Sequence, residues 1–364
     1  MNKKVGILGA GLCGLLLARR LHESGISFRI FEARGRLGGR IHTISEDVRR
    51  VEMGATWFGL QHKHLRELLQ ELQIGSFHQF QDGKGVFESS SMAPVQVFDI
   101  PEEEQSSFRL KGGTYSLIQK IAGELAQEAI LTESPVVRLA LEDGRVLVTT
   151  KNGTTEYFDL VVSTLPPNLF LNTVNVSPAL SEPMHTLAEQ THTWMGTSIK
   201  FAVSYARPFW REKGYAGVCF SNASIASEIH DHVDEDQKRY SLKGFLVPGA
   251  VRLVPSQRET MVREQLQRYF GDEGADYLAY DELLWANETF TMGGMSNDLV
   301  PHYNNGHPGF AKPELHGKLL ISGSETSPVY GGYMEGAVYA AEHAAKWAIE
   351  ALLQMPKKEA LSRP

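Results

Sequence analysis

The chain has 364 residues and a formal net charge of −7, and hydrophobic and charged residues make up 42% and 22% of it. This composition excludes wholesale disorder, and without a long Lys/Arg block or an apolar span of membrane length we expect no nucleic-acid partner and no membrane anchor. Two cysteines, Cys13 and Cys219, cannot form a disulfide framework, which predicts a reducing, cytoplasmic compartment.

The first 32 residues predict a parallel strand–turn–helix–strand unit. Residues 4–8 form an apolar run, 12–24 carry leucines at helical spacing, and 26–32 alternate. Residues 76–109 are polar, contain two prolines, and predict an irregular surface excursion. Further helices are predicted at 61–74, 114–129, 256–270 and 333–353, and strands within 130–164 and 196–247 and at 319–322.

The turn between the first strand and helix carries glycines at the spacing that binds a dinucleotide. Gly9 makes a tight turn, Gly11 lets the backbone approach a pyrophosphate, and Gly14 lets the helix pack on the strand. Glu32 ends the second strand, where a carboxylate accepts hydrogen bonds from a ribose diol. A lone glycine-rich turn is weak evidence, but the full spacing favours a dinucleotide site.

The next segment adds a second phosphate-binding feature. Gly38 and Gly39 stand between Arg36 and Arg40, so backbone and guanidinium groups are both available to an anion. Alone, such a segment is typical of a solvated basic turn. Directly after the glycine turn and Glu32, it strengthens the prediction of a dinucleotide site.

This combination resembles the flavin-containing amine oxidase family, which includes monoamine oxidases, polyamine oxidases and L-amino-acid oxidases. The resemblance covers nearly the whole chain. It continues through residues 53–57, 110–114 and 159–166, and its most specific block runs from Ile321 to Ser327 and from Gly332 to Val338.

The resemblance implies an α/β fold of two domains. One is a Rossmann-type, p-hydroxybenzoate-hydroxylase-like FAD-binding domain, and the other is an α+β substrate domain built on a mixed or antiparallel sheet. The implied FAD-binding domain is discontinuous, over residues 1–75, 110–178 and 288–364, and the substrate domain comprises 76–109 and 179–287.

FAD is therefore the expected cofactor, and the resemblance assigns residues to it. It puts Glu325 near the pyrophosphate and ribityl chain, Val136 or Val137 beside the adenine, and the Met334 amide against the pyrimidine edge of the flavin. A helix N-terminus carries roughly half a positive charge, so a helix that starts there favours flavin reduction. The expected FAD-binding residues are Gly9, Gly11, Leu12, Cys13, Gly14, Glu32, Ala33, Arg34, Gly38, Gly39, Arg40, Gly54, Ala55, Thr56, Val136, Val137, Gly323, Glu325, Gly332, Tyr333 and Met334.

Lys200 and Tyr333 are the expected catalytic residues. Strand alternation alone predicts an exposed Lys200, but the resemblance implies a lysine bridged by water to flavin N5. Tyr333 would form one wall of an aromatic cage around the substrate amine. The opposite wall should follow Gly294, where the chain has Met295 and Ser296, so both the second aromatic and the flavin-linking cysteine of monoamine oxidases are absent. We therefore expect non-covalent FAD.

Four more residues are candidates for lining the substrate cavity: Trp57, Trp285, Phe290 and Ser296. Ordinary core packing explains the two tryptophans equally well. The His-x-His pairs at 62–64 and 230–232 lack further ligands, so they predict surface histidines and no metal site.

The implied reaction is a two-electron oxidation of a small amine or amino acid, with O2 reoxidising the flavin and hydrogen peroxide as product. A related dehydrogenase or desaturase acting on a non-amine substrate is the nearest alternative, and a non-catalytic FAD-binding scaffold is a further one. An NAD dehydrogenase is a less favoured alternative, because residues 332–336 would have no function in such an enzyme. Family members carry a helical part where this chain has the short segment 75–110, which predicts a site that is open or covered by a partner.

Overall fold

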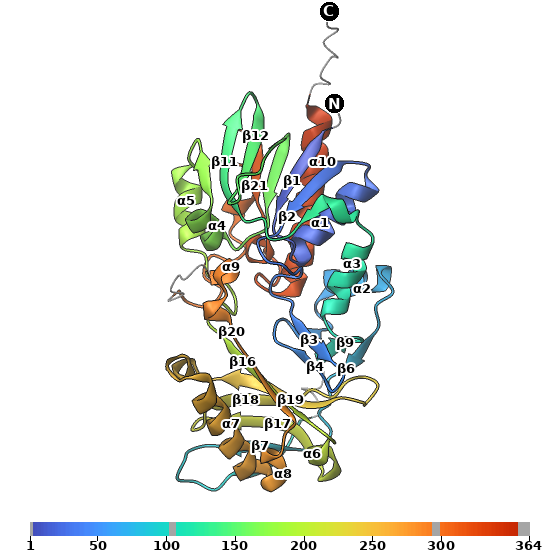
Figure 1. Cartoon of the computed structure of the whole chain (residues 1–364), viewed down its shortest axis with the longest axis vertical. Helices are drawn as coiled ribbons and strands as arrows, with labels where there is room; N and C mark the ends of the chain where they lie inside the picture. Colours follow the sequence, from blue (N-terminus) through green and yellow to red (C-terminus); the bar gives the residue numbers. More distant parts are fainter. Residues whose placement is uncertain (1–2, 102–106, 293–298, 356–364) are drawn as a thin grey trace, which may run out of the picture.

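A computed structural model of the chain describes residues 3–101, 107–292 and 299–355. The molecule is elongated (Figure 1). A parallel sheet and the long helix α10 (Met334–Gln354) lie in one half, and a seven-stranded sheet lies in the other. Among the described residues, no helix is both long and apolar enough to cross a bilayer.

The parallel sheet has five strands in the order β10-β2-β1-β14-β21, and every neighbouring pair is parallel. Such a sheet is covered on both faces, which explains why all of its β14 residues are buried. The predicted strands at 4–8, 26–32, 160–164 and 319–322 are confirmed within a residue or two. The bounds are β1 (Lys4–Leu8), β2 (Ser27–Phe31), β10 (Ile130–Leu131), β14 (Leu160–Ser163) and β21 (Leu319–Ile321).

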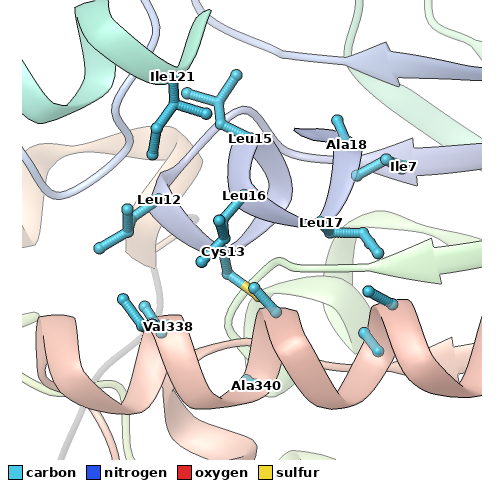
Figure 2. Close-up of a cluster of buried hydrophobic side chains, with 14 of the residues drawn as sticks. Ile7, Leu12, Cys13, Leu15, Leu16, Leu17, Ala18, Ile121, Val338 and Ala340 are labelled. Carbon is cyan, nitrogen blue, oxygen red and sulfur yellow. The ribbon is translucent and has the colours of Figure 1, made fainter. Parts of the chain in front are cut away.

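Helices from opposite ends of the chain cover this sheet together. Figure 2 shows Leu12, Cys13 and Leu16 of α1 (Leu12–Glu23) facing Val338 and Ala340 of α10. The alanines of α10 are buried, and their small side chains let the two helices approach closely. The core of this half is therefore built from the first and the last elements of the chain.

Smaller sheets and helices complete this half. In one sheet, β11 pairs antiparallel with β12 and parallel with β15, and short turns at 143–144 and 151–154 separate β11, β12 and β13. The elements are β3 (Thr43–Glu46), β4 (Arg49–Glu52), β5 (Phe58–Gly59), β6 (Ser76–His78), β9 (Ser107–Leu110), β11 (Val136–Glu142), β12 (Arg145–Thr150), β13 (Thr155–Phe158), β15 (Asn175–Ser177), α2 (Lys63–Glu71), α3 (Tyr115–Gly123), α4 (Pro167–Thr173), α5 (Glu182–Glu189) and α9 (Thr289–Met292).

The seven-stranded sheet has the order β20-β16-β19-β18-β17-β7-β8. Only the β17–β7 pair is parallel, so the sheet is mixed, as the resemblance implied. Its apolar face packs on α7 around Phe201, Trp210 and Leu266. The elements are β7 (Lys84–Glu88), β8 (Gln96–Asp99), β16 (Ile199–Tyr205), β17 (Tyr215–Ser221), β18 (Ala226–Asp231), β19 (Tyr240–Leu246), β20 (Ala279–Leu284), α6 (Phe209–Glu212), α7 (Pro255–Phe270) and α8 (Asp272–Ala275).

Two sequence predictions are wrong in detail. Residues 76–109 are not irregular throughout, because β7 and β8 form one edge of the seven-stranded sheet. β8 is the edge strand and is mostly exposed, which weakens its apolar pattern, whereas β7 lies between β17 and β8. The helix predicted at 114–129 ends at Gly123, and a short 3-10 turn at Gln127–Ala129 follows. The division into two domains stays a prediction.

Candidate functional site

A cavity of about 540 Å³ opens at the carboxyl ends of β1 and β2. Such an edge of a parallel sheet is where dinucleotides bind. Segments far apart in the sequence line the cavity: 8–13, 31–34, 38–41, Ala55, 135–137, 164–166, 289–291 and 332–334, together with Lys151, Leu169, Thr173, Ser324 and Ala337.

The first turn has the geometry that the glycine spacing predicted. Gly9 has a φ of +97°, which favours glycine, and its N–H donates to Phe31 O at 2.8 Å. A Cβ on Gly14 would lie 2.0 Å from Gly9 O, so only glycine lets α1 pack there. A Cβ on Gly11 would meet nothing closer than 4.0 Å. That open space, beside an α1 N-terminus without a side-chain cap, suits a phosphate.

Glu32 lies in the cavity wall at the end of β2. Its two carboxylate oxygens accept hydrogen bonds from Ala10 N at 2.8 Å and Arg34 N at 2.9 Å. These bonds fix the carboxylate but leave lone pairs on both oxygens, which suits a ribose diol. The neighbouring Ala33 and Arg34 line the same cavity.

The second glycine segment lies beside the first turn. Gly38 N donates to Ala10 O at 2.8 Å, and both Gly38 and Gly39 have positive φ. Arg40 follows, and its guanidinium pairs with Glu325 at 2.6 Å and donates to Trp194 O at 3.0 Å. Gly38, Gly39 and Arg40 all line the cavity.

Glu325 and Gly323 support the cavity from behind and do not line it. Glu325 is 1% exposed. Burial alone would raise the pKa of this carboxyl, but Arg40 and the Ser324 hydroxyl outweigh burial and lower it. Gly323 packs against the backbone of Thr164, where a Cβ would come within 3.3 Å.

Residues 288–291, which we call the strap, lie along one side of the cavity. The Arg34 guanidinium donates to Glu288 at 3.0 Å and to Thr291 Oγ1 at 2.8 Å, and it lies 5.7 Å from the Phe290 ring centre. Phe290 was expected in the substrate cavity, but it lines the dinucleotide cavity. Val136 and Val137 also line the dinucleotide cavity, as expected.

The N-terminus of α10 forms another wall. Gly332 has a φ of +89°, and a Cβ there would lie 2.4 Å from Trp194 Cβ. Tyr333, the N-cap, offers no side-chain cap, so the amides of the first helical turn point into the cavity region. The Tyr333 ring is 37% exposed and stacks on His302 at 5.6 Å, and Met334 lines the cavity beside it.

Lys200 is buried, which corrects the exposed lysine that alternation predicted. Every β16 residue is buried, because α7 covers one face of the sheet and Met53 with its neighbours covers the other. The Lys200 ammonium donates to Gly54 O and does not itself line the cavity. Ala55, which follows Gly54 in the sequence, does line the cavity. Burial lowers the pKa of Lys200 to about 8.

Lys243 is a buried lysine that the sequence analysis missed. It is 0% exposed, donates to Thr56 Oγ1, and lies 4.6 Å from the Trp57 ring centre. The sequence feature that could have identified it is a lysine inside the apolar strand 240–246. Gly54 and Thr56, both expected at FAD, lie on this lysine side and do not line the cavity.

The other substrate-cavity candidates fall elsewhere. Trp285 is 2% exposed and donates to Met53 O at 2.9 Å, as a core residue does. Trp57 is half-buried and donates to Gln79 Oε1 at 2.8 Å. Ser296, like Met295 and Gly294, lies outside the described residues.

The prediction of surface histidines is wrong for two of the four. His62 is 6% exposed and accepts from Gly59 N, and His232 is 1% exposed and accepts from Glu52 N. His64 and His230 are half-buried. Over residues 3–101, 107–292 and 299–355, no group of three metal-ligating side chains comes together.

Both cysteines are protonated thiols in apolar surroundings. Burial raises the pKa of Cys13 to about 12, and burial raises that of Cys219 as well. Cys13 lines the cavity at the first turn, whereas Cys219 belongs to the core of the seven-stranded sheet.

The cavity volume, the open glycine cradle, the fixed carboxylate and two helix N-termini together fit a dinucleotide such as FAD.

Comparisons with known proteins find a matching family model and related chains. A family model described as flavin containing amine oxidoreductase matches residues 12–90 and 83–349. An L-amino acid dehydrogenase from Synechocystis is 33% identical over 241 residues, which are 65% of this chain and 50% of that protein. Amine oxidase B from Sus scrofa is 24% identical over 98% of this chain and 88% of its own length.

Solved structures share the fold. Cyclohexylamine oxidase from Brevibacterium oxydans superposes with a TM-score of 0.85 at 20% identity, covering 97% of this chain and all of the other. Putrescine oxidase bound to putrescine superposes with a TM-score of 0.84 at 21% identity, covering 96% and 99%. These likenesses confirm the expected α/β fold.

Proposed function

The chain belongs to the flavin-containing amine oxidoreductase family, and we propose that it oxidises a small amine or amino acid at the C–H bond next to nitrogen, with O2 as final acceptor. At the level of the family, it is a flavin-dependent oxidoreductase acting on amines. The observation that carries the finer proposal is one cavity shared by the glycine turn, Glu32 and the α10 N-terminus.

We assign FAD to this cavity with the following contacts. The amides at Gly11 and Leu12 hold the pyrophosphate, and Glu32 binds the adenosine ribose. Val136 packs on the adenine, and the Met334 amide faces the flavin pyrimidine edge. The lining of the cavity supports each of these positions. The raised pKa of both buried thiols supports non-covalent attachment, because a thiolate is the form that attacks a ring.

Two side chains act on the substrate in this proposal. When bound, FAD supplies a two-electron acceptor for the substrate C–H bond and passes the electrons to O2. The half-exposed ring of Tyr333 gives the amine an apolar wall beside the α10 N-terminus. Lys200, held behind Ala55 by Gly54 O, carries an ammonium whose pKa burial lowers to about 8. The substrate reacts as the neutral amine, so the rate rises with pH across the substrate pKa.

An anaerobic reduction screen tests the proposal. Purified protein with FAD is mixed with amines and amino acids without oxygen, and absorbance at about 450 nm is followed. Bleaching by a nitrogen substrate, followed by one peroxide per turnover on adding air, is the expected result. A chain that no amine or amino acid bleaches would contradict the proposal.

The second candidate is a dehydrogenase that passes its electrons to an acceptor other than O2. The relative named L-amino acid dehydrogenase favours it. Bleaching by substrate with slow recovery in air, together with fast recovery on adding a quinone or dye, would select this candidate.

A further inference from the structure

Lys243 lies next to Lys200 on the same face of the seven-stranded sheet. In the antiparallel β16–β19 pair, Ala202 stands opposite Lys243 and Lys200 opposite Phe245. The two lysines are therefore diagonal neighbours on adjacent strands, about 7–8 Å apart at their backbones. Both side chains extend toward the segment 54–56.

One turn of backbone holds both amines. Lys243 Nζ donates to Thr56 Oγ1, and that hydroxyl donates to Gly54 O at 3.1 Å. The same carbonyl accepts from Lys200. Ala55, between them, lines the cavity assigned to FAD. The pair thus lies directly behind the cavity wall, linked by a continuous series of hydrogen bonds.

The surroundings do not support two positive charges. Lys243 is fully buried, and within the described part of the chain neither lysine forms an ion pair. Burial lowers the pKa of Lys243 well below the ordinary value, and Lys200 and Arg109 lower it further. Glu52 and Glu228 act in the opposite direction without overcoming burial. Two like charges on one buried turn titrate as a pair that holds one proton.

Other titratable groups lie around Lys243, and His232 Nδ1 among them is buried without a hydrogen-bond partner. The Glu52 carboxylate accepts from Thr43 Oγ1 at 2.7 Å and from Thr114 N at 2.9 Å. His232 Nε2 accepts from Glu52 N at 3.2 Å, and Arg109 beside it disfavours a charged ring. His230 pairs with Glu228 toward the surface. Burial raises the pKa of Glu52, so this carboxyl is the competing proton acceptor that the Glu52→Gln variant below distinguishes from the lysine pair.

We propose that Lys243 is the proton store of this site: the Lys200–Lys243 pair holds one proton while the flavin is oxidised and takes a second from solvent, at Lys243 Nζ, when the flavin is reduced. The proposal rests on FAD occupying the cavity as assigned above. The added negative charge of the reduced ring favours this uptake, in which the Lys243 amine gains one proton and becomes an ammonium. Reduction of the flavin by two electrons is then accompanied by the uptake of two protons by the protein–flavin complex instead of one.

The test is the pH dependence of the flavin midpoint potential in the FAD-loaded full chain. Chemical reduction replaces the substrate, so the result does not depend on which amine the protein oxidises. A two-electron potential moves by about 30 mV per pH unit for each proton taken up. Between about pH 6 and about pH 7.5, Lys200 keeps its proton, so a second proton reports on Lys243.

Wild type is expected to fall by about 60 mV per pH unit and Lys243→Met by about 30 mV. Glu52→Gln and the exposed-lysine control Lys238→Met should keep the wild-type slope. A wild-type slope of about 30 mV, or equal slopes in wild type and Lys243→Met, would overturn the proposal. If Lys243→Met does not fold, counting protons taken up per two electrons by wild type decides the matter, because one proton overturns it. Failure to oxidise amines, by contrast, would count against the proposed function alone.

Discussion

Replacing Lys200 by methionine should stabilise the fold while it slows catalysis. The pKa of Lys200 falls from 10.5 to about 8 because burial disfavours its charge. At 1.36 kcal/mol per unit, holding the charged lysine costs the folded state about 3 kcal/mol at neutral pH. Methionine keeps the volume and loses one hydrogen bond to Gly54 O, a loss of about 1 kcal/mol. That carbonyl still accepts from Thr56, so it stays satisfied. The net gain is about 2 kcal/mol.

The sign of the pH dependence follows from proton binding. Between about pH 8 and pH 10.5 the unfolded chain binds more protons at Lys200 than the folded chain, so wild-type stability rises with pH. Below about pH 8 Lys200 is protonated in both the folded and the unfolded chain, so the full free-energy cost of its buried charge applies. The advantage of Lys200→Met should therefore be largest at neutral pH and fall to about half near pH 9.

Urea unfolding of the FAD-saturated proteins at several pH values measures this difference. Anaerobic stopped-flow mixing with a substrate measures flavin reduction in the same samples. A variant that is less stable than wild type at pH 7, or whose advantage does not shrink with rising pH, would refute the reasoning from burial. Unchanged reduction and reoxidation rates would remove Lys200 from the mechanism.

Three further results are expected. Arg34→Ala removes the ties to Glu288 in the strap, so FAD should dissociate about tenfold faster, followed by flavin fluorescence after dilution. The control Arg36→Ala, whose guanidinium reaches Glu288 only at 3.9 Å, should change the rate less. Gly14→Ala puts a methyl group 2.0 Å from Gly9 O, so it should abolish FAD binding and cost about 3 kcal/mol in thermal unfolding. Acid precipitation should leave all flavin in the supernatant, whereas yellow, flavin-bearing precipitate would contradict non-covalent binding.

The parallel unit could be predicted from sequence because its signals are local. Gly9, Gly14 and Glu32 stand at fixed spacings within one strand–turn–helix–strand segment, and the structure brings them together at one cavity. Long apolar runs such as 160–163 also identify strands that are covered on both faces. The edge strand β8 is mostly exposed and gives a weaker pattern, which is why it escaped detection.

The lysine site could not be predicted from alternation. Period-two patterns tell which residues share a face, but they do not tell whether that face meets solvent or another part of the protein. The face that carries Lys200 and Lys243 is covered by the segment 51–56, which comes from the other half of the chain. Burial of His232 has the same origin. Long-range packing decides these features.

The packing of α1 on α10 has a consequence for how the protein is made. A ribosome that adds about 5–20 residues per second needs roughly 15–60 s between releasing α1 and completing α10. During that time the leucines of α1 that face α10 in Figure 2 have no covering helix. The nascent cofactor site therefore stays unfinished until α10 has been made, when the alanine-rich helix docks and closes the core. We therefore expect the cofactor to be captured only after α10 has docked on α1.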